Sequence, residues 1–315
     1  MEENRPTLSD LRQWLNDPLT ASLGDRFGKL DISLLSQAKS IADGTTVLLL
    51  RDAAGQSRAV VLCSAPASPG LVQRAMARAH QAKVILGPSI GAHVLDPLVE
   101  GSARGLTYAV LPYCYKLSDS RPVWWIQRAL LRRPVLEWLR RLTECTVQGV
   151  KEFEIGPRFA EPLRQIVSLD SVSKRVRCAA ERAIERLRSG TWTPQYVLMH
   201  GDFEKGNLLI HPANKEYEKR GWRERFVVID WPGSVIQGYA IFDLVRLSQS
   251  MRLNAQSLRN EVDRHCHLLR CERADAASYL LAALGHIAMN LEHFPMDRYA
   301  RMADACLATL ERILD

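Results

Sequence analysis

Residues 197–211, VLMHGDFEKGNLLIH, place a histidine, an aspartate and an asparagine at the point where one apolar run stops and another begins. Apolar runs usually end in turn residues, so charged and amide side chains here indicate a loop with a chemical role. His200 and Asp202 follow the first run directly, and Asn207 precedes the second. This spacing holds a carboxylate and a carboxamide close together beside buried backbone.

A second apolar run, residues 226–230 (FVVID), also ends in an aspartate, Asp230. We expect it to pair with residues 195–210 as an antiparallel hairpin, which brings Asp202, Asn207 and Asp230 to one edge. Two carboxylates and a carboxamide are hard oxygen ligands that suit Mg²⁺ better than Zn²⁺. Magnesium held by few protein groups usually shares its shell with phosphates, and a nearby carboxylate can accept a proton from a hydroxyl. The pattern therefore predicts phosphoryl transfer from a nucleotide.

Bulk composition limits the class of protein. The 315 residues are 47% hydrophobic with a formal net charge of +7, which is typical of a globular chain that favours anionic ligands. The seven cysteines form no Cys-x-x-Cys pair, as expected for reduced thiols. No apolar run approaches the length of a membrane span, and the polar first residues do not resemble a signal peptide. We expect a cytoplasmic protein.

Patterning along the chain predicts an α+β fold with two unlike lobes. Residues 1–115 read as a β-rich lobe with one helix, 70–86, among strands at 31–35, 46–50, 59–63 and 106–112. Residues 116–315 read as a larger helical lobe that contains the hairpin. Its expected helices are residues 123–131, 135–150, 160–168, 171–189, 255–270, 274–292 and 297–314.

HGDFEKGNLLI followed by VVIDWPGSVIQGYAIFDLVRL resembles the catalytic core of the aminoglycoside phosphotransferase and choline kinase family. That family has His-Gly-Asp, four residues, Asn, a strand ending in Ile-Asp-Phe/Trp, and Asp-Leu about a dozen residues later. The resemblance implies a protein-kinase-like fold with two lobes, a small antiparallel-sheet N-lobe that binds nucleotide and a helical C-lobe that binds the acceptor. It also implies an ATP- and Mg²⁺-dependent kinase of a small-molecule hydroxyl.

The resemblance also assigns roles to single residues. Asp202 matches the catalytic base, and Asn207 and Asp230 match the magnesium ligands. His200 and Asp243 match residues that support the catalytic loop. Residues 111–115, LPYCY, match the segment between the lobes, so Leu111 and Tyr113 are expected at the adenine ring. Lys205 is a candidate contact of the γ-phosphate, and the alternative is a solvated loop lysine.

The N-terminal lobe departs from the family pattern. Active members carry a basic residue at the end of the third strand. The corresponding residues 58–64, RAVVLCS, end without a basic residue, and the following helix contains no acid to pair with one. We expect Arg74 and Arg78, one helical turn apart, to hold the phosphates instead. Arg51 is the candidate if the preceding strand takes that place. The alternative function is a pseudokinase that binds nucleotide or a protein partner without turnover.

The remaining features concern binding partners. Residues 121–142 interleave tryptophans with arginines on two expected helices separated by Pro134. One interpretation is that this segment contacts a membrane surface. The favoured interpretation is that its tryptophans are buried in the helical lobe and its arginines are exposed to solvent. Residues 265–271, HCHLLRC, lack a second ligand pair for zinc. No basic stripe with spaced aromatics indicates nucleic acid. The acceptor stays open among aminoglycosides, sugars and choline-like molecules, and the sequence indicates no oligomeric state.

Overall fold

The computed structural model describes residues 6–37, 45–212, 225–291 and 294–314 of the chain. Contacts between backbone segments divide the protein into two compact units. The first contains residues 1–84, 92–116 and 209–232, and the second contains residues 85–91, 117–208 and 233–315. The mixture of an antiparallel sheet with many helices confirms the predicted α+β class.

The first unit is built on a five-stranded antiparallel sheet with the strand order β1-β2-β3-β5-β4. The sequence predicted four of these strands at nearly the observed positions and did not predict β4. The bounds are β1 (Asp31–Gln37), β2 (Thr45–Arg51), β3 (Ser57–Ser64), β4 (Val99–Ala103) and β5 (Leu106–Pro112). Alternate residues of the central strands are buried on opposite faces, because a strand turns successive side chains to opposite sides.

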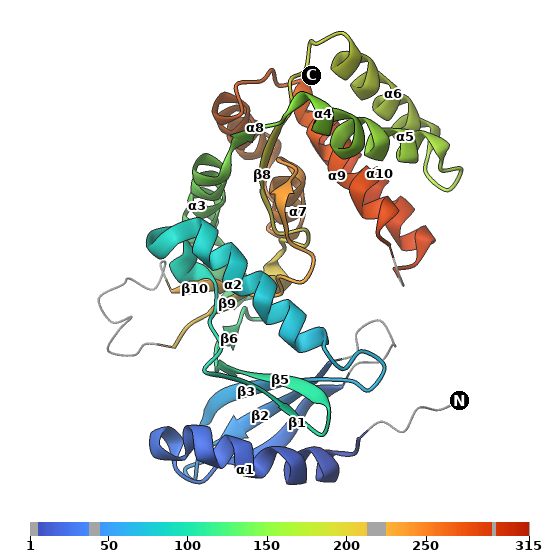
Figure 1. Cartoon of the computed structure of the whole chain (residues 1–315). Coiled ribbons are helices and arrows are strands. Elements are labelled where there is room, and N and C mark those ends of the chain that lie inside the picture. The colour runs from blue at the N-terminus through green and yellow to red at the C-terminus, as the bar shows by residue number, and fades with distance from the viewer. Residues whose placement is uncertain (1–5, 38–44, 213–224, 292–293, 315) are drawn as a thin grey trace. The chain divides into compact units, whose positions relative to one another are not determined.

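Helix α1 (Leu8–Phe27) covers one face of this sheet and was not predicted. Figure 1 shows it, in dark blue, lying against the strands. It begins with a capping box between Thr7 and Asp10, and its leucines at three- and four-residue spacing are buried against the strands. The Asp17-Pro18 pair reads as a helix end. Burial of the leucines on both sides of this pair stabilises the fold by about 1.5–3 kcal/mol per side chain, so the helix continues through Pro18.

Helix α2 (Leu71–Ile90) covers the opposite face and matches the predicted helix at its start. Val72 and Met76 pack against Leu62, Ala109 and Leu111 of the sheet. The helix is interrupted at Gly87, whose φ of 68° is non-helical. Helices therefore cover both faces of the sheet, where the sequence predicted one helix.

Two smaller sheets replace the single predicted hairpin. One has the order β10-β9-β6, from β6 (Tyr115–Lys116), β9 (Leu208–Ile210) and β10 (Phe226–Val228). The other has the order β11-β8-β7, from β7 (Gln148–Gly149), β8 (Gln195–Met199) and β11 (Val235–Gly238). Residues 195–210 are thus two strands in different sheets, and the expectation of one strand there was wrong. The loop between β8 and β9 carries the His-Gly-Asp motif.

The second unit is mainly helical, as predicted. Its helices are α3 (Arg121–Thr146), α4 (Glu152–Ile155), α5 (Glu161–Ser168), α6 (Lys174–Arg188), α7 (Phe242–Ser250), α8 (Ala255–Leu268), α9 (Asp275–Met289) and α10 (Met296–Leu314). Helices α5 and α9 approach so closely that a Cβ on Gly285 would lie 2.0 Å from the carbonyl oxygen of Pro162. Only glycine fits at this crossing.

Helix α3 is continuous through Pro134, so the prediction of two short helices was wrong. Proline removes one backbone hydrogen bond inside a helix and usually ends it. Here Leu131, Val135, Trp138 and Leu139 are buried on both sides of the proline. This continuous apolar face offsets the lost hydrogen bond and keeps the two halves in register.

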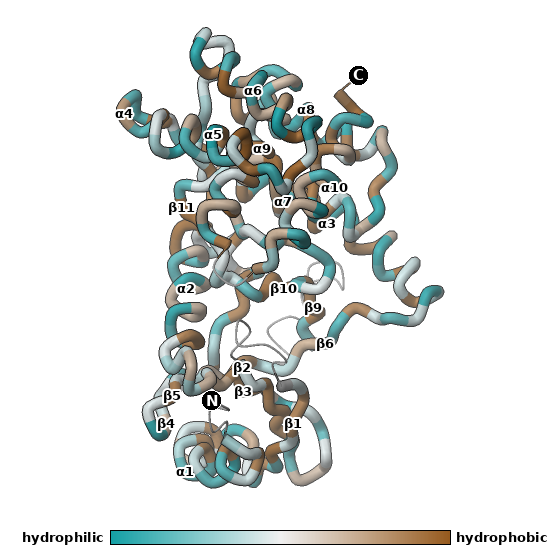
Figure 2. The backbone as a smooth tube through the Cα atoms, turned by 90° about the vertical axis from the view of Figure 1, so that its right-hand side faces the viewer, coloured by the Kyte–Doolittle hydropathy of each residue, from teal (hydrophilic) through white to brown (hydrophobic). Residues whose placement is uncertain are grey.

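Hydropathy varies over short distances along the chain. Hydrophilic and hydrophobic residues alternate along helices such as α2 and α10 (Figure 2). Among the helices in the described residues, none has both the length and the apolar character that crossing a bilayer requires.

Candidate functional site

The His-Gly-Asp motif lies on the loop that joins β8 to β9, inside the second unit. β8 is buried along most of its length and pairs with both β7 and β11, which fixes the start of the loop. A 3₁₀ turn, Lys205–Asn207, ends it. Phe203 is fully buried, with its ring 5.4 Å from the ring of Trp138 on α3. The loop is therefore anchored at both ends and at its middle.

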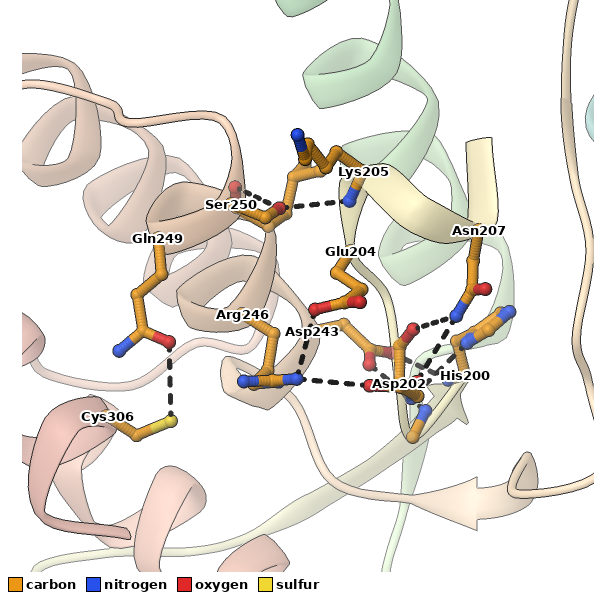
Figure 3. A network of polar contacts seen from close by, with 12 residues as sticks. His200, Asp202, Glu204, Lys205, Asn207, Asp243, Arg246, Gln249, Ser250 and Cys306 are labelled. Atoms are coloured by element: carbon orange, nitrogen blue, oxygen red, sulfur yellow. Dashed lines mark hydrogen bonds and ion pairs between the residues drawn. The ribbon is translucent and has the colours of Figure 1, made fainter. Parts of the chain in front are cut away.

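Asp243 on α7 holds the backbone of this loop (Figure 3). Its carboxylate accepts hydrogen bonds from the backbone N–H of His200 at 2.6 Å and of Gly201 at 3.1 Å. The residue is 5% exposed. Burial raises the pKa of Asp243 to about 7, while these N–H donors act in the opposite direction. Asp243 therefore supports the backbone of this loop, the contact that the sequence analysis predicted for it.

The start of α7 is strained in a way that places this carboxylate. Ile241, just before the helix, has a φ of 72°, which a β-branched residue rarely adopts. The N–H of Phe242 donates to the carbonyl of Ala240 at 2.8 Å, so the chain makes a γ-turn here. Strain of this kind costs about 1–3 kcal/mol and persists only where the surrounding structure enforces it. Because of this turn, Asp243, which is two residues after Ile241, lies within hydrogen-bond distance of the loop amides.

Asp202 and Asn207 lie side by side, as the sequence predicted. The side-chain N–H₂ of Asn207 donates to the backbone carbonyl of Asp202 at 2.8 Å and to its Oδ2 at 3.3 Å. The Asp202 side chain is 51% exposed. Since the amide nitrogen of Asn207 serves Asp202, its carbonyl oxygen is the atom left for another ligand. The pair therefore presents one exposed carboxylate and one amide oxygen.

Arg246 is a member of this network that the sequence analysis did not identify. Its Nη2 lies 3.2 Å from Oδ1 of Asp202 and 3.3 Å from Oε2 of Glu204 (Figure 3). The spacing of three residues after Asp243 puts both side chains on one face of α7. That spacing was a usable signal. Arg246 holds one oxygen of Asp202 while Asn207 holds the other.

Gly201 fits a position that no other residue could occupy without movement. Its φ is 87°, and a Cβ there would lie 2.5 Å from the carbonyl oxygen of Gly233. The loop is therefore packed directly against the backbone that follows the Ile-Asp-Trp sequence. His200 is buried, and its Nδ1 accepts from the N–H of Asp202 at 3.3 Å.

Lys205 is exposed, and its ammonium nitrogen lies 5.0 Å from the ring centre of Trp124 on α3. Its backbone N–H donates to the Ser250 hydroxyl at 3.1 Å. The predicted contact of Lys205 with a γ-phosphate stays a prediction.

The other predicted residues belong to the first unit. Asp230 has a φ of 68°, a conformation that aspartate tolerates better than most residues. Leu111 pairs with Val60 in the sheet, and the N–H of Tyr113 donates to the carbonyl of Arg58 at 3.0 Å. Their roles at a metal and at an adenine ring stay predictions.

Arg74 and Arg78 are exposed on the face of α2 away from its packing against the sheet. β3 ends in two buried residues, Cys63 and Ser64. The Ser64 hydroxyl accepts from the N–H of Val72 at 3.0 Å and so caps the first turn of α2. Arg51 closes β2 and donates to the Ser33 hydroxyl at 3.3 Å.

Residues 265–271 form no metal site. Within the described part of the chain, no group of three or more histidine, cysteine, aspartate or glutamate side chains is placed to bind a metal. His265 is instead a core residue of α8, and burial lowers its pKa to about 4.

Solved structures of known proteins share this architecture. A candidate fructosamine-3-kinase from Haemophilus somnus 129PT matches 96% of this chain and 97% of its own, with a TM-score of 0.53 and 11% identity. The choline kinase LicA from Streptococcus pneumoniae matches 93% of this chain and 99% of its own, with a TM-score of 0.50 and 12% identity. The fold is protein-kinase-like. No protein-family profile and no curated protein sequence matches the chain.

These similarities confirm the predicted resemblance at the level of the fold. At 11–12% identity they do not carry activity or substrate from one chain to the other.

Proposed function

We propose that this protein is a phosphotransferase that moves the γ-phosphate of ATP to a hydroxyl group of a small molecule. One observation carries the proposal. An exposed carboxylate, Asp202, lies beside a carboxamide, Asn207, on a loop whose backbone is held by the buried Asp243. In a protein-kinase-like fold, this is the arrangement that a catalytic base and a magnesium ligand require.

Asp202 would orient the acceptor hydroxyl and take its proton. A base must be held in one orientation to do this, because small displacements cost large factors in rate. Asn207 on one oxygen and Arg246 on the other restrain the carboxylate. His200 and Asp243 restrain the backbone beneath it.

The residues present fit magnesium. The amide oxygen of Asn207 and the carboxylate of Asp230 are hard oxygen donors, and the Asn207 nitrogen is already engaged by Asp202. A positive φ such as that of Asp230 is frequent at ligand-binding positions. When bound, the ion would neutralise charge on the nucleotide phosphates.

Nucleotide binding needs further groups in the first unit. Leu111 and Tyr113 would receive the adenine ring at the end of β5. Polyphosphate also needs a fixed cation, and Arg74 and Arg78 are the proposed pair, with Lys205 at the γ-phosphate. Arg74→Ala and Arg78→Ala should each raise the KM for ATP. Arg51→Ala should leave the KM unchanged, because the guanidinium of Arg51 already donates to the Ser33 hydroxyl.

The acceptor is proposed as a class: an aminoglycoside, a sugar or a choline-like alcohol. The names of the similar structures, a candidate fructosamine-3-kinase and a choline kinase, support small alcohols of this kind.

A second candidate is a pseudokinase that binds nucleotide or a protein partner without turnover. The observation in its favour is the end of β3, where two buried residues, Cys63 and Ser64, stand where active relatives have a base. The first turn of α2 also contains no acid.

Calorimetry with ATP and Mg²⁺, followed by an ADP-release assay against a panel of hydroxyl compounds, separates these functions. We expect Asp230→Asn to lose Mg²⁺-dependent nucleotide binding with an unchanged melting temperature. Asp202→Ala should bind nucleotide and lose turnover. The matched control is Asp297→Asn, an exposed acid on α10. Nucleotide binding by the wild type without turnover of any acceptor would favour the pseudokinase. Full binding by Asp230→Asn would refute the metal assignment.

A further inference from the structure

The first half of α3 exposes large apolar side chains. Val123, Trp125 and Ile126 are 44%, 59% and 63% exposed. The favoured expectation, that the tryptophans of residues 121–142 are buried, is correct for Trp138, whose indole N–H donates to the Ile90 carbonyl at 3.0 Å. It is wrong for Trp125. Trp125 and Ile126 are consecutive residues of the helix, and neighbouring exposed apolar side chains of this size often mark an interaction site.

Arginines continue the same surface of the helix. Residues seven apart lie on one helical face, so Arg132 follows Trp125 and Arg133 follows Ile126. We call Trp125, Ile126, Arg132 and Arg133 the α3 stripe. Both arginines are exposed, and neither makes an ion pair with any residue in the described ranges. A further guanidinium, that of Arg128, lies 4.7 Å from the ring centre of Trp125. The stripe therefore joins an apolar end to a basic end.

The basic end of the stripe opens into a groove between α3 and α8. This groove has a volume of about 790 Å³. Its charged lining residues are Arg132, Arg133, Glu137, Arg140, Glu261, Asp263 and Arg264. Each acid has its own partner: Glu137 pairs with Arg140, Glu261 with Arg264, and Asp263 with Arg273. The guanidinium groups of Arg132 and Arg133 are therefore in excess, and the groove favours an anion.

We propose that the α3 stripe docks on a membrane surface that contains anionic lipids. Exposed tryptophan and isoleucine fit the boundary between headgroups and acyl chains, while arginine side chains reach up to the phosphates. Each arginine near an anionic surface adds about 1 kcal/mol of attraction. The groove then holds a lipid phosphate beside Arg132 and Arg133. Nucleic acid would use the arginines but would leave the aliphatic side chain of Ile126 without a partner.

The α3 stripe lies next to a residue that contacts the loop containing Asp202. Trp124 precedes Trp125 in the chain, and the ammonium nitrogen of Lys205 lies 5.0 Å from the centre of its ring. Both residues belong to the same compact unit. The membrane-bound protein would present the loop that contains Asp202 close to the lipid headgroups. The docking itself does not depend on the proposed kinase activity.

Vesicle co-sedimentation of the full chain tests this proposal. We expect binding to vesicles of phosphatidylcholine mixed with phosphatidylglycerol and little binding to phosphatidylcholine alone. Tryptophan fluorescence should shift to shorter wavelength on binding. Trp125→Ala with Ile126→Ala, and separately Arg132→Glu with Arg133→Glu, should each weaken binding about tenfold or more. These residues are exposed, so circular dichroism and melting temperature should not change.

The control variants change exposed residues outside the α3 stripe. Phe153→Ala removes an apolar side chain that is 75% exposed, and Arg301→Glu with Arg312→Glu reverses two exposed charges on α10. Both should bind vesicles as the wild type does. The proposal is overturned if the wild-type protein binds neither kind of vesicle, or if the control variants weaken vesicle binding as much as the stripe variants do. It is also overturned if the stripe variants bind vesicles normally but lose binding to duplex DNA or lose dimerisation.

Discussion

Asp243→Ala is the substitution that tests the architecture of the site most directly. Asp243 is 5% exposed, and its carboxylate accepts hydrogen bonds from the backbone N–H groups of His200 and Gly201 in the His-Gly-Asp loop, at 2.6 and 3.1 Å. Alanine accepts neither. The N–H groups of His200 and Gly201 would then lose their partner, the first in a buried position and the second in a partly buried one.

The magnitude follows from those two donors. Each unsatisfied buried donor costs about 1–3 kcal/mol, so Asp243→Ala should lower the free energy of unfolding by about 2–6 kcal/mol. The melting temperature should fall by about 4 °C or more. Asp202→Ala removes a half-exposed carboxylate whose ion pair with Arg246 is worth about 0–1 kcal/mol. Both variants should lose turnover, but only the first should lose stability.

Urea unfolding followed by circular dichroism gives the free energies, and hydrogen exchange of the loop amides gives the location. Asp243→Asn is the shape-matched variant. Its amide keeps one acceptor but turns an N–H₂ group toward the second backbone donor, so it should also be destabilised, by less than alanine. If Asp243→Ala unfolds at the urea concentration of the wild type while Asp202→Ala does not, the supporting role of Asp243 is refuted.

Three further variants test other parts of the second unit. Arg246→Lys should lower kcat by about 10–100-fold with an unchanged KM for ATP, because lysine cannot hold Asp202 and Glu204 with one planar group; an equal rise in KM would contradict a role confined to Asp202. Gly201→Ala should destabilise the protein more than Gly190→Ala, since both have a positive φ but only Gly201 faces a backbone oxygen; equal melting temperatures would argue against the close approach. Relative to His265→Leu, the wild type should lose about 2 kcal/mol of stability between pH 8 and pH 5, because the folded pKa of His265 is about 4 and the unfolded chain takes up the proton first. The raised pKa of Asp243 acts in the opposite direction but is common to both proteins. Urea titrations of the two proteins at the two pH values measure this difference, and an equal pH dependence of their stability would refute it.

The sequence predicted the parts of the fold that depend on short spacing. Four of the five strands of the first sheet, the helix that begins near residue 70 and the helical character of the second half follow from periodicity. Helix α1 was not predicted, although its leucine spacing continues through Asp17 and Pro18. Pro134 led to the wrong prediction of two helices in place of α3. In both helices, burial of a long apolar face outweighed the local cost of proline.

Within the site, the sequence by itself determined which atoms are available: a carboxylate at Asp202, an amide at Asn207, and the spacing that puts them on one loop. Only the tertiary structure decided which oxygen of Asp202 meets Asn207 and which meets Arg246, because Arg246 lies 44 residues away along the chain. It also decided that Trp138 is buried and Trp125 is exposed on the same helix. Spacing fixes local neighbours, whereas contacts between distant segments and burial arise only when whole elements pack together.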